Sequence, residues 1–250
     1  MDISFIMITN QKYEDVAKRA VDSIKAAIAT YPKKYTYEIL ICSPYPLTDI
    51  AEENRNKLIG SVHDIGEENV FWIKDGEEGV SGNGIAAYNH GYAWSLGDYI
   101  FVLNDDHLID ARSLRAIDFL ESELFEDRKY KVTSIGANKG VNIYNSTLIP
   151  VMPYVEPYRC LIMGFPVYQR KTIRNYLGDN IFNPRFKHHY ADNWLPFWLH
   201  HMGEPPIICD DTPLYGFLGP GLSTTHNDDY DFDEFDDLTR RFSEGDHNYA

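Results

Sequence analysis

The sequence has few cysteines and no long apolar run, and each shortage excludes a class of protein. Only Cys42, Cys160 and Cys209 occur among 250 residues, which are too few and too scattered for a disulfide framework or a cysteine-based zinc site. No apolar run approaches the ~20 residues of a membrane-spanning helix. The start Met1-Asp2-Ile3-Ser4 lacks the charged and apolar regions of a signal peptide. We therefore expect free thiols, no membrane span and a cytoplasmic location.

Basic residues are also scarce. The chain has 23 Lys and Arg against 38 Asp and Glu, and its net charge of −15 disfavours binding to nucleic acid or anionic membrane through the overall field. The 44% hydrophobic and 14% aromatic residues are typical of a folded protein. The length suits one domain. We expect that domain to span 1–226, and the acidic tail 227–250 to be a solubilising or docking segment outside the core.

The first 75 residues alternate between strand and helix patterns. Strands are predicted at Ile3–Thr9, Tyr37–Cys42 and Asn69–Lys74, and apolar residues recur at helical spacing over 16–28. A second short helix over 48–58 is predicted between the last two strands. This β-α-β-α-β order indicates an α/β fold with a mostly parallel sheet.

A glycine-rich stretch, 75–84, follows the third strand. It is not a phosphate-binding P-loop, because no Gly-Lys-Ser/Thr sequence ends it. A helix is predicted over 85–96, with small residues on one side that let it lie close to the sheet, and Gly97 is expected to end it. Asn89 in this helix faces either solvent or the crevice beyond the strand ends.

The polar run Asn104-Asp105-Asp106-His107 follows a short apolar strand, Ile100–Leu103. In open α/β sheets, ligands bind beyond the carboxyl ends of such strands. Oxygen-rich side chains there suit Mg²⁺ or Mn²⁺, which in turn suit a diphosphate. The alternative is an acidic turn that caps the next helix.

The second half of the chain is less regular. Helices are predicted over 112–125, 171–177 and 192–202, and a strand over 130–135. The stretch 136–168 is rich in Asn, Pro and Tyr, which suits a substrate-facing region better than another strand–helix unit.

Two stretches together resemble the GT-A glycosyltransferases, especially those of family 2. They are AAYNHGYAWSLGDYIFVLNDD at 86–106 and FNPRFKHHYADNW at 182–194. The resemblance covers roughly residues 3–203. It implies a three-layer α/β/α fold with a nucleotide-sugar-binding half at 1–110 and an acceptor-binding half at 111–226.

The resemblance also implies roles for particular residues. Asp106 would hold Mn²⁺ or Mg²⁺ on the donor diphosphate, with Asp105 or Asn104 near the sugar or ribose. Asp192 would be the general base that takes the proton of the acceptor hydroxyl. The implied activity is transfer of a sugar from a nucleotide-diphosphate donor to a glycan or other hydroxyl acceptor, with inversion. Asp192 also suits the N-cap of the helix behind it, and both roles can hold at once.

The sequence departs from the family pattern where the second strand ends in Ile41-Cys42-Ser43-Pro44, without an acidic residue. We expect the other donor contacts to come from Thr9, Asn10, Asp75 and Asn89. His226 is either a further metal ligand or an ordinary surface histidine.

Three rival functions are weighed against a glycosyltransferase. Asn104 and Ala191, which stand where the family has acidic residues, favour a catalytically inactive relative that binds a sugar or nucleotide. A sugar-phosphate nucleotidyltransferase shares the sheet order but needs a glycine- and arginine-rich loop after the first strand. A calcium-binding module around 229–233 fails because Glu234 and Arg240 occupy the positions of the EF-hand glycine and glutamate.

Overall fold

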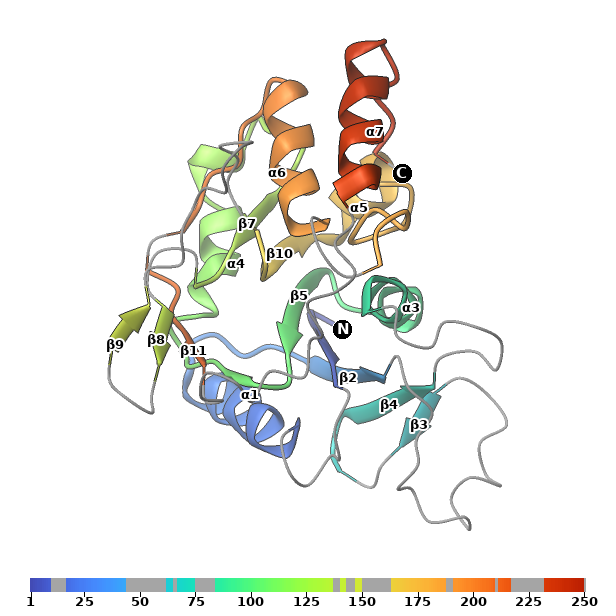
Figure 1. Cartoon of the computed structure of the whole chain (residues 1–250). Helices are drawn as coiled ribbons and strands as arrows, with labels where there is room; N and C mark the ends of the chain where they lie inside the picture. The colour runs from blue at the N-terminus through green and yellow to red at the C-terminus, as the bar shows by residue number, and fades with distance from the viewer. Residues whose placement is uncertain are drawn as a thin grey trace.

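A seven-stranded sheet lies at the centre of the computed structural model (Figure 1). The structure describes residues 1–9, 17–43, 62–64, 67–74, 84–136, 140–142, 147–149, 163–187, 191–209, 211–216 and 232–249. The strands lie in the order β3 (Val62–Asp64), β4 (Val70–Lys74), β2 (Tyr37–Ser43), β1 (Ile3–Ile8), β5 (Tyr99–Asn104), β10 (Pro166–Gln169) and β7 (Val132–Ser134).

The sheet is mostly parallel, as the sequence predicts. Strands β4, β2, β1 and β5 are parallel, whereas β3 and β10 run antiparallel to their neighbours. Ile8 of β1 lies opposite both Cys42 of β2 and Asn104 of β5. The carboxyl ends of these central strands therefore meet at one edge of the sheet.

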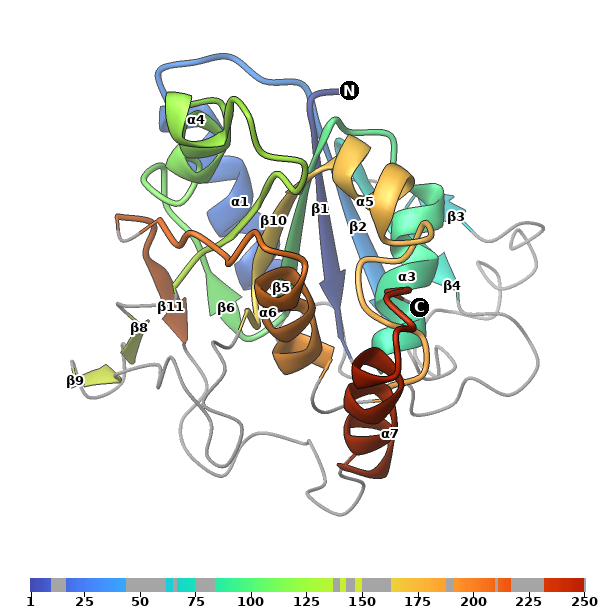
Figure 2. The ribbon, with the colours of Figure 1, turned by 90° about the horizontal axis from the view of Figure 1, so that it is seen from above.

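Helices cover both faces of the sheet, which gives three layers (Figure 2). On one face lie α1 (Lys18–Thr30) and α4 (Arg115–Leu120), and on the other lie α3 (Gly84–Trp94), α5 (Arg170–Tyr176), α6 (Ala191–His201) and α7 (Phe232–Ser243). Strand residues alternate between the two cores: Phe5 packs on the α1 side and Ile6 on the α3 side. None of the helices in the described part of the chain is long and apolar enough to cross a membrane.

A second, smaller sheet begins where the central strand β5 ends. Its strands lie in the order β6 (His107–Leu108), β11 (Leu214–Gly216), β8 (Gly140–Asn142) and β9 (Thr147–Ile149). Only the turn formed by Asp105 and Asp106 separates β5 from β6. The acidic pair therefore lies at the junction of the two sheets.

Several predicted elements are confirmed and others differ. Strands β1, β2 and β4 and helices α3, α5 and α6 lie within a few residues of their predicted bounds. The predicted helix 112–125 is wrong in length: α4 ends at Leu120, and a short 3-10 helix, η2, follows at Glu123–Phe125. The predicted helix 48–58 and most of the glycine-rich stretch lie outside the described residues.

Gly97 is required for a different reason from the one predicted. Helix α3 ends earlier, at Trp94, and Gly97 is not among the glycines with positive φ. A Cβ at Gly97 would lie 2.4 Å from the backbone nitrogen of Ser4, and the Gly97 N–H donates a 2.7 Å hydrogen bond to Ser4 Oγ. The chain thus enters β5 in direct contact with β1, where only glycine fits.

The C-terminal segment is part of the fold, which corrects the expectation that it lies outside the core. Helix α7 contributes Phe235, Leu238 and Phe242 to the core on the α3 side, and Tyr249 is buried there too. These apolar residues recur at helical spacing, but the sequence analysis gave more weight to the many acidic residues around them. The predicted boundary at residue 226 lies outside the described residues and stays a prediction.

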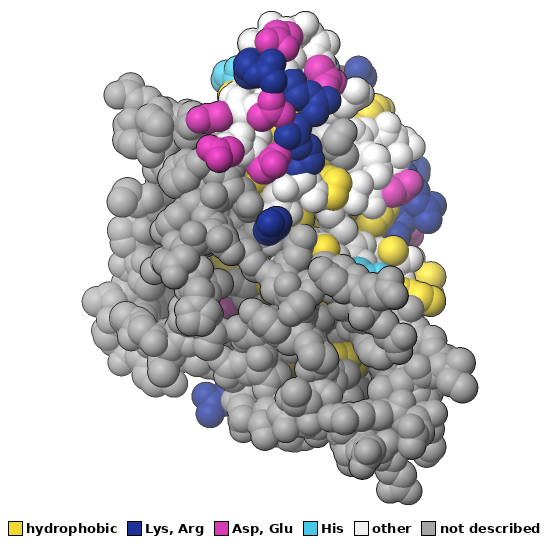
Figure 3. Space-filling view, turned by 45° about the vertical axis from the view of Figure 1, so that its right-hand side comes forward, with side chains coloured by type: hydrophobic (Ala, Val, Ile, Leu, Met, Phe, Trp, Pro, Cys, Tyr) yellow, Lys and Arg dark blue, Asp and Glu magenta, His cyan; other side chains and the backbone are white. Residues whose placement is uncertain are grey.

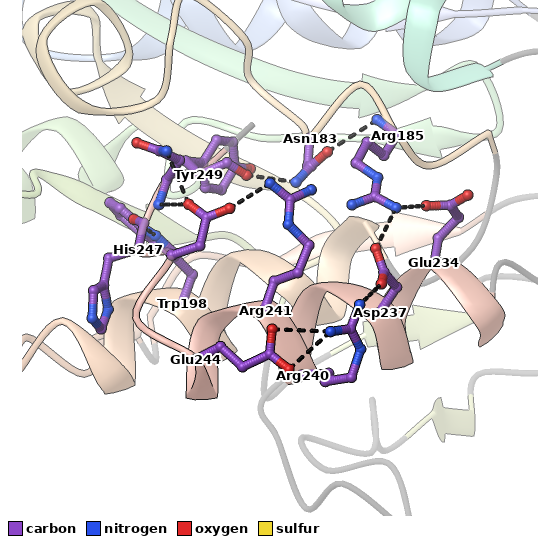
Figure 4. Close-up of polar contacts among 12 residues, drawn as sticks. Asn183, Arg185, Trp198, Glu234, Asp237, Arg240, Arg241, Glu244, His247 and Tyr249 are labelled. Carbon is purple, nitrogen blue, oxygen red and sulfur yellow. Dashed lines mark hydrogen bonds and ion pairs between the residues drawn. The ribbon is translucent and has the colours of Figure 1, made fainter.

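The residues after α7, 244–249, form a strap across α6. The Tyr249 carbonyl accepts hydrogen bonds from Trp194 Nε1 at 3.1 Å and from Asn183 Nδ2 at 2.5 Å. Trp198 Nε1 donates to the His247 carbonyl at 3.0 Å, and Figure 4 shows Asn183, Trp198, His247 and Tyr249 together. The strap therefore joins α6 to the loop that precedes it.

The outer face of α7 is held by ion pairs. Arg185 contacts Glu234 at 2.6 Å and Asp237 at 2.7 Å, and Arg240 contacts Glu244 at 2.9 Å (Figure 4). Acidic and basic side chains accordingly lie intermixed over α7 (Figure 3). The charges of Glu234 and Asp237 on this helix are thus locally balanced.

Candidate functional site

The candidate site is the edge at which β1 and β5 end. Asp105 is the first residue after β5, and its N–H donates to the Ile8 carbonyl at 3.2 Å. Thr9, the first residue after β1, is buried and donates its Oγ1–H to Asp105 Oδ2 at 2.5 Å. The two strand ends are thus tied together through both main chain and side chain.

The surroundings of the Asp105 carboxylate disfavour its charged form. The residue is only 9% exposed. The pKa of Asp105 is raised to about 6, mainly by burial and also by the neighbouring Asp106 carboxylate, against the opposing effect of the Thr9 hydrogen bond. Excess negative charge at this edge is the electrostatic condition that favours binding of a cation.

Asp106 is oriented by the residue that follows it. Asp106 Oδ1 lies 2.5 Å from His107 Nδ1, and both side chains are partly exposed. The His107 ring packs against Phe165, with ring centroids 4.5 Å apart. This contact leaves the second carboxylate oxygen, Oδ2, as the one not engaged by His107.

Tyr88 of α3 reaches the end of β5 from the other face. Its hydroxyl donates to the Leu103 carbonyl at 3.0 Å and also contacts Asn104 Oδ1. Burial raises the pKa of Tyr88, and the charges of Asp105, Asp106 and Asp192 raise it further. The phenol is therefore neutral at physiological pH.

Asp192 reaches the same region from α6. It lies in the first turn of that helix, where a carboxylate is favoured by the helix dipole. Its main-chain carbonyl accepts from the Met163 N–H at 3.0 Å. Its charge acts on the Tyr88 hydroxyl together with those of Asp105 and Asp106. The two sequence stretches that carry the family resemblance therefore converge on one site.

The structure brings together five of the predicted site residues: Thr9, Asn104, Asp105, Asp106 and Asp192. Three others, Asn10, Asp75 and His226, lie outside the described residues, so their roles stay predictions.

Asn89 has a structural task that the sequence did not indicate. Its Nδ2 donates to the Phe182 carbonyl at 2.8 Å, and its Oδ1 accepts from the N–H groups of Ile181 and Phe182 at 3.0 and 3.1 Å. Both ends of the amide thus hold the loop that leads toward α6. The predicted donor contact of Asn89 gains no support from this arrangement.

Sequence analysis missed Tyr88. The available signal was its position next to Asn89, as a large side chain with a hydroxyl on a helix otherwise rich in alanine and glycine. Gly91 explains why this helix reaches the strand ends: a Cβ there would lie 2.4 Å from Cys42 Sγ and 2.7 Å from Ile6 Cγ2. The predicted close approach of helix and sheet is confirmed.

The described residues contain no group of three or more His, Cys, Asp and Glu side chains arranged to hold a metal ion. The acidic pair alone nevertheless has the right chemistry for Mn²⁺ or Mg²⁺, since carboxylate oxygens are the ligands these ions prefer. The pKa of Asp105 is raised mainly by burial and also by the neighbouring Asp106 carboxylate, and a bound cation would offset both effects. Asp106 is the residue of the pair that would hold such an ion.

Comparison with known proteins adds solved structures only, because no family model and no curated protein matches the sequence. The chain is similar to S. aureus TarS 1-349 in complex with UDP-GlcNAc, at 16% identity over 88% of this chain and 60% of that chain, with a TM-score of 0.57. It is also similar to the mannosyltransferase PcManGT from Pyrobaculum calidifontis in complex with GDP-Man and Mn²⁺, at 12% identity over 88% and 58% of the two chains, with a TM-score of 0.56.

These similarities confirm the predicted fold: the chain has the GT-A glycosyltransferase fold, an α/β/α sandwich around a mostly parallel sheet. The chain spans about 60% of the length of these two structures. At this level of identity the likeness concerns the fold, so activity has to be argued from the site.

Proposed function

We propose that this chain is a metal-dependent glycosyltransferase that moves a sugar from a nucleotide-diphosphate donor to an acceptor hydroxyl with inversion. The observation that carries the proposal is the acidic pair at the end of β5, where Thr9 holds Asp105, together with Asp192 in the first turn of α6, whose charge also acts on the Tyr88 hydroxyl. Two carboxylates at the end of β5 and one at the start of α6 supply a cation-binding pair and a separate base. The similar structures support the donor class, because their complexes contain UDP-GlcNAc and GDP-Man.

In this proposal some residues bind the donor and another residue acts on the acceptor. A divalent cation, when bound, neutralises charge on the diphosphate, and Asp106 is the residue proposed to hold it. Thr9 fixes Asp105 beside it. Asp192 accepts the acceptor hydroxyl proton while the new bond to the anomeric carbon forms and the bond to the diphosphate breaks. Direct displacement of this kind inverts the anomeric carbon.

The test is to incubate the protein with a panel of nucleotide sugars and Mn²⁺ and to measure turnover as the release of the nucleoside diphosphate. Water can replace the unknown acceptor, so slow donor hydrolysis is the readout. We expect Asp192→Asn to lower kcat by about 10²–10⁴-fold, the usual effect of removing a general base, while donor affinity is kept. Asp106→Asn is expected to abolish the effect of Mn²⁺ on donor binding.

A matched control is Asp127→Asn, since this exposed carboxylate lies in a turn beyond η2 and is expected to change neither quantity. Binding of a nucleotide sugar without turnover would instead support the inactive sugar-binding relative. Full activity of Asp192→Asn would refute the role of that residue as base.

A further inference from the structure

Tyr88 makes two contacts at the end of β5 with a single hydroxyl proton. Its oxygen lies 3.0 Å from the Leu103 carbonyl and also touches Asn104 Oδ1. The main-chain contact fixes the hydroxyl relative to β5. The same proton is shared with Asn104 Oδ1, and this contact fixes the rotation of the Asn104 amide, because Oδ1 is held on the Tyr88 side.

The rest of the Asn104 amide is available to a ligand. Among the residues that the structure describes, Asn104 Nδ2 has no hydrogen-bond partner, and the side chain is partly exposed at the strand end. An amide nitrogen donates hydrogen bonds and accepts none. Asn104 Nδ2 is thus an uncharged hydrogen-bond donor beside the acidic pair.

Tyr88 is itself rigidly placed. It is buried, and its ring packs edge-on against Phe182 with centroids 5.5 Å apart. The neighbouring Asn89 clamps the main chain at Phe182, and Gly91 lets α3 lie directly on the sheet. Three independent contacts of α3 therefore determine where the Tyr88 hydroxyl lies.

We propose that Tyr88 is a positioning residue of the donor site, which holds Asn104 so that Nδ2 donates a hydrogen bond to an oxygen of a bound nucleoside diphosphate. The inference rests on the proposed function and deepens it. Phosphate oxygens next to Asp105 and Asp106 face carboxylates that repel them. A neutral N–H donor attracts such an oxygen without adding a third negative charge.

The inference predicts that Tyr88 and Asn104 act as one unit. Titration calorimetry with UDP and with GDP, each with Mn²⁺, would compare wild type, Tyr88→Phe, Asn104→Ala and the double variant. We expect Tyr88→Phe to weaken binding of the nucleotide that wild type prefers by about tenfold, the effect of one ligand hydrogen bond. The double variant is expected to bind no more weakly than Asn104→Ala, because the two changes remove the same contact.

Tyr92→Phe is the matched control. Tyr92 lies one turn further along α3, is equally buried, and faces the Arg170 guanidinium 5.1 Å from its ring instead of the strand end. Its variant is expected to bind nucleotide as wild type does. Urea unfolding of all variants separates loss of affinity from loss of stability.

The outcomes distinguish this inference from the proposed function. If wild type binds nucleotide and Tyr88→Phe binds equally well, or if the two losses simply add, the positioning role is overturned while the donor site stands. If Tyr92→Phe weakens binding as much as Tyr88→Phe, the effect is a general one of α3 and the inference fails. If wild type binds neither UDP nor GDP with Mn²⁺, both the inference and the proposed donor site fail.

Discussion

Replacement of Tyr249 by alanine should destabilise the whole domain, although this residue lies at the very end of the described chain. Tyr249 is 3% exposed, its ring packs edge-on against Trp198 at 5.3 Å, and its hydroxyl donates to the Ile181 carbonyl at 3.3 Å. Truncating a buried aromatic side chain to alanine costs about 3–5 kcal/mol. That is a large part of the ~5–15 kcal/mol that stabilises a typical domain.

The main chain of the strap adds to this cost. Once Tyr249 no longer anchors it, the Tyr249 and His247 carbonyls can leave three buried donors, Asn183 Nδ2, Trp194 Nε1 and Trp198 Nε1. Each buried donor left without a partner costs about 1–3 kcal/mol. We therefore expect the loss for Tyr249→Ala to be at least ~3 kcal/mol.

Urea unfolding followed by tryptophan fluorescence measures the loss, because Trp194 and Trp198 lie under the strap. Tyr249→Phe is the control: it keeps the ring and removes one long hydrogen bond, so we expect a loss of about 1 kcal/mol or less. A loss below about 1 kcal/mol for Tyr249→Ala, equal to that of Tyr249→Phe, would show that the strap does not stabilise the core in solution.

Three further predictions concern other parts of the fold. Gly97→Ala should cost about 3 kcal/mol or more in urea unfolding, because the new Cβ would meet main-chain atoms of β1 that cannot move aside. Arg170→Met should cost about 3 kcal/mol in the same assay, since this buried guanidinium donates two hydrogen bonds, at 2.5 and 2.7 Å, to the loop between α3 and β5. Burial raises the pKa of Asp110, but hydrogen bonds from Arg112 and Tyr215 outweigh it and hold the pKa below 3.8. Asp110 therefore contributes stability above pH 3.8 that is lost as the pH falls through the lower folded pKa. The small deficit of Asp110→Asn, under about 1 kcal/mol at pH 7, should therefore shrink as the pH is lowered below 3.8.

The sequence predicts the central part of the sheet because its signals are local. Apolar runs of five or six residues alternate with helical spacing up to Leu103, and the strand–helix order determines a parallel arrangement. The strands β10 and β11 carry three or four residues each. Their identity depends on pairing with partners far along the chain, which no local pattern indicates. Phe235, Leu238 and Phe242 did carry a helical pattern, and the acidic residues between them concealed it.

The candidate site was predictable where a residue type and a strand end coincide. Asp105 and Asp106 follow a buried strand, and the rule that ligands bind beyond strand ends identifies them without a structure. Asp192 required the family resemblance, since only the folded chain brings α6 near β5. Tyr88 and Asn89 could not be assigned, because neighbouring residues of one helix face different partners: the end of β5 for Tyr88 and the 181–182 main chain for Asn89.

The route of the chain between β7 and β10 has a consequence for how such a protein can change. Ser134 at the end of β7 pairs with Pro166 at the start of β10, so the whole excursion between them leaves and re-enters the sheet at adjacent positions. Its length is therefore uncoupled from the register of the central strands. Segments can be inserted, shortened or exchanged there at little cost to the seven-stranded sheet, as long as β8 keeps its pairing with β11 and Phe165 keeps its place against His107. A graft of this excursion between relatives would therefore leave in place the strand ends that hold the acidic pair.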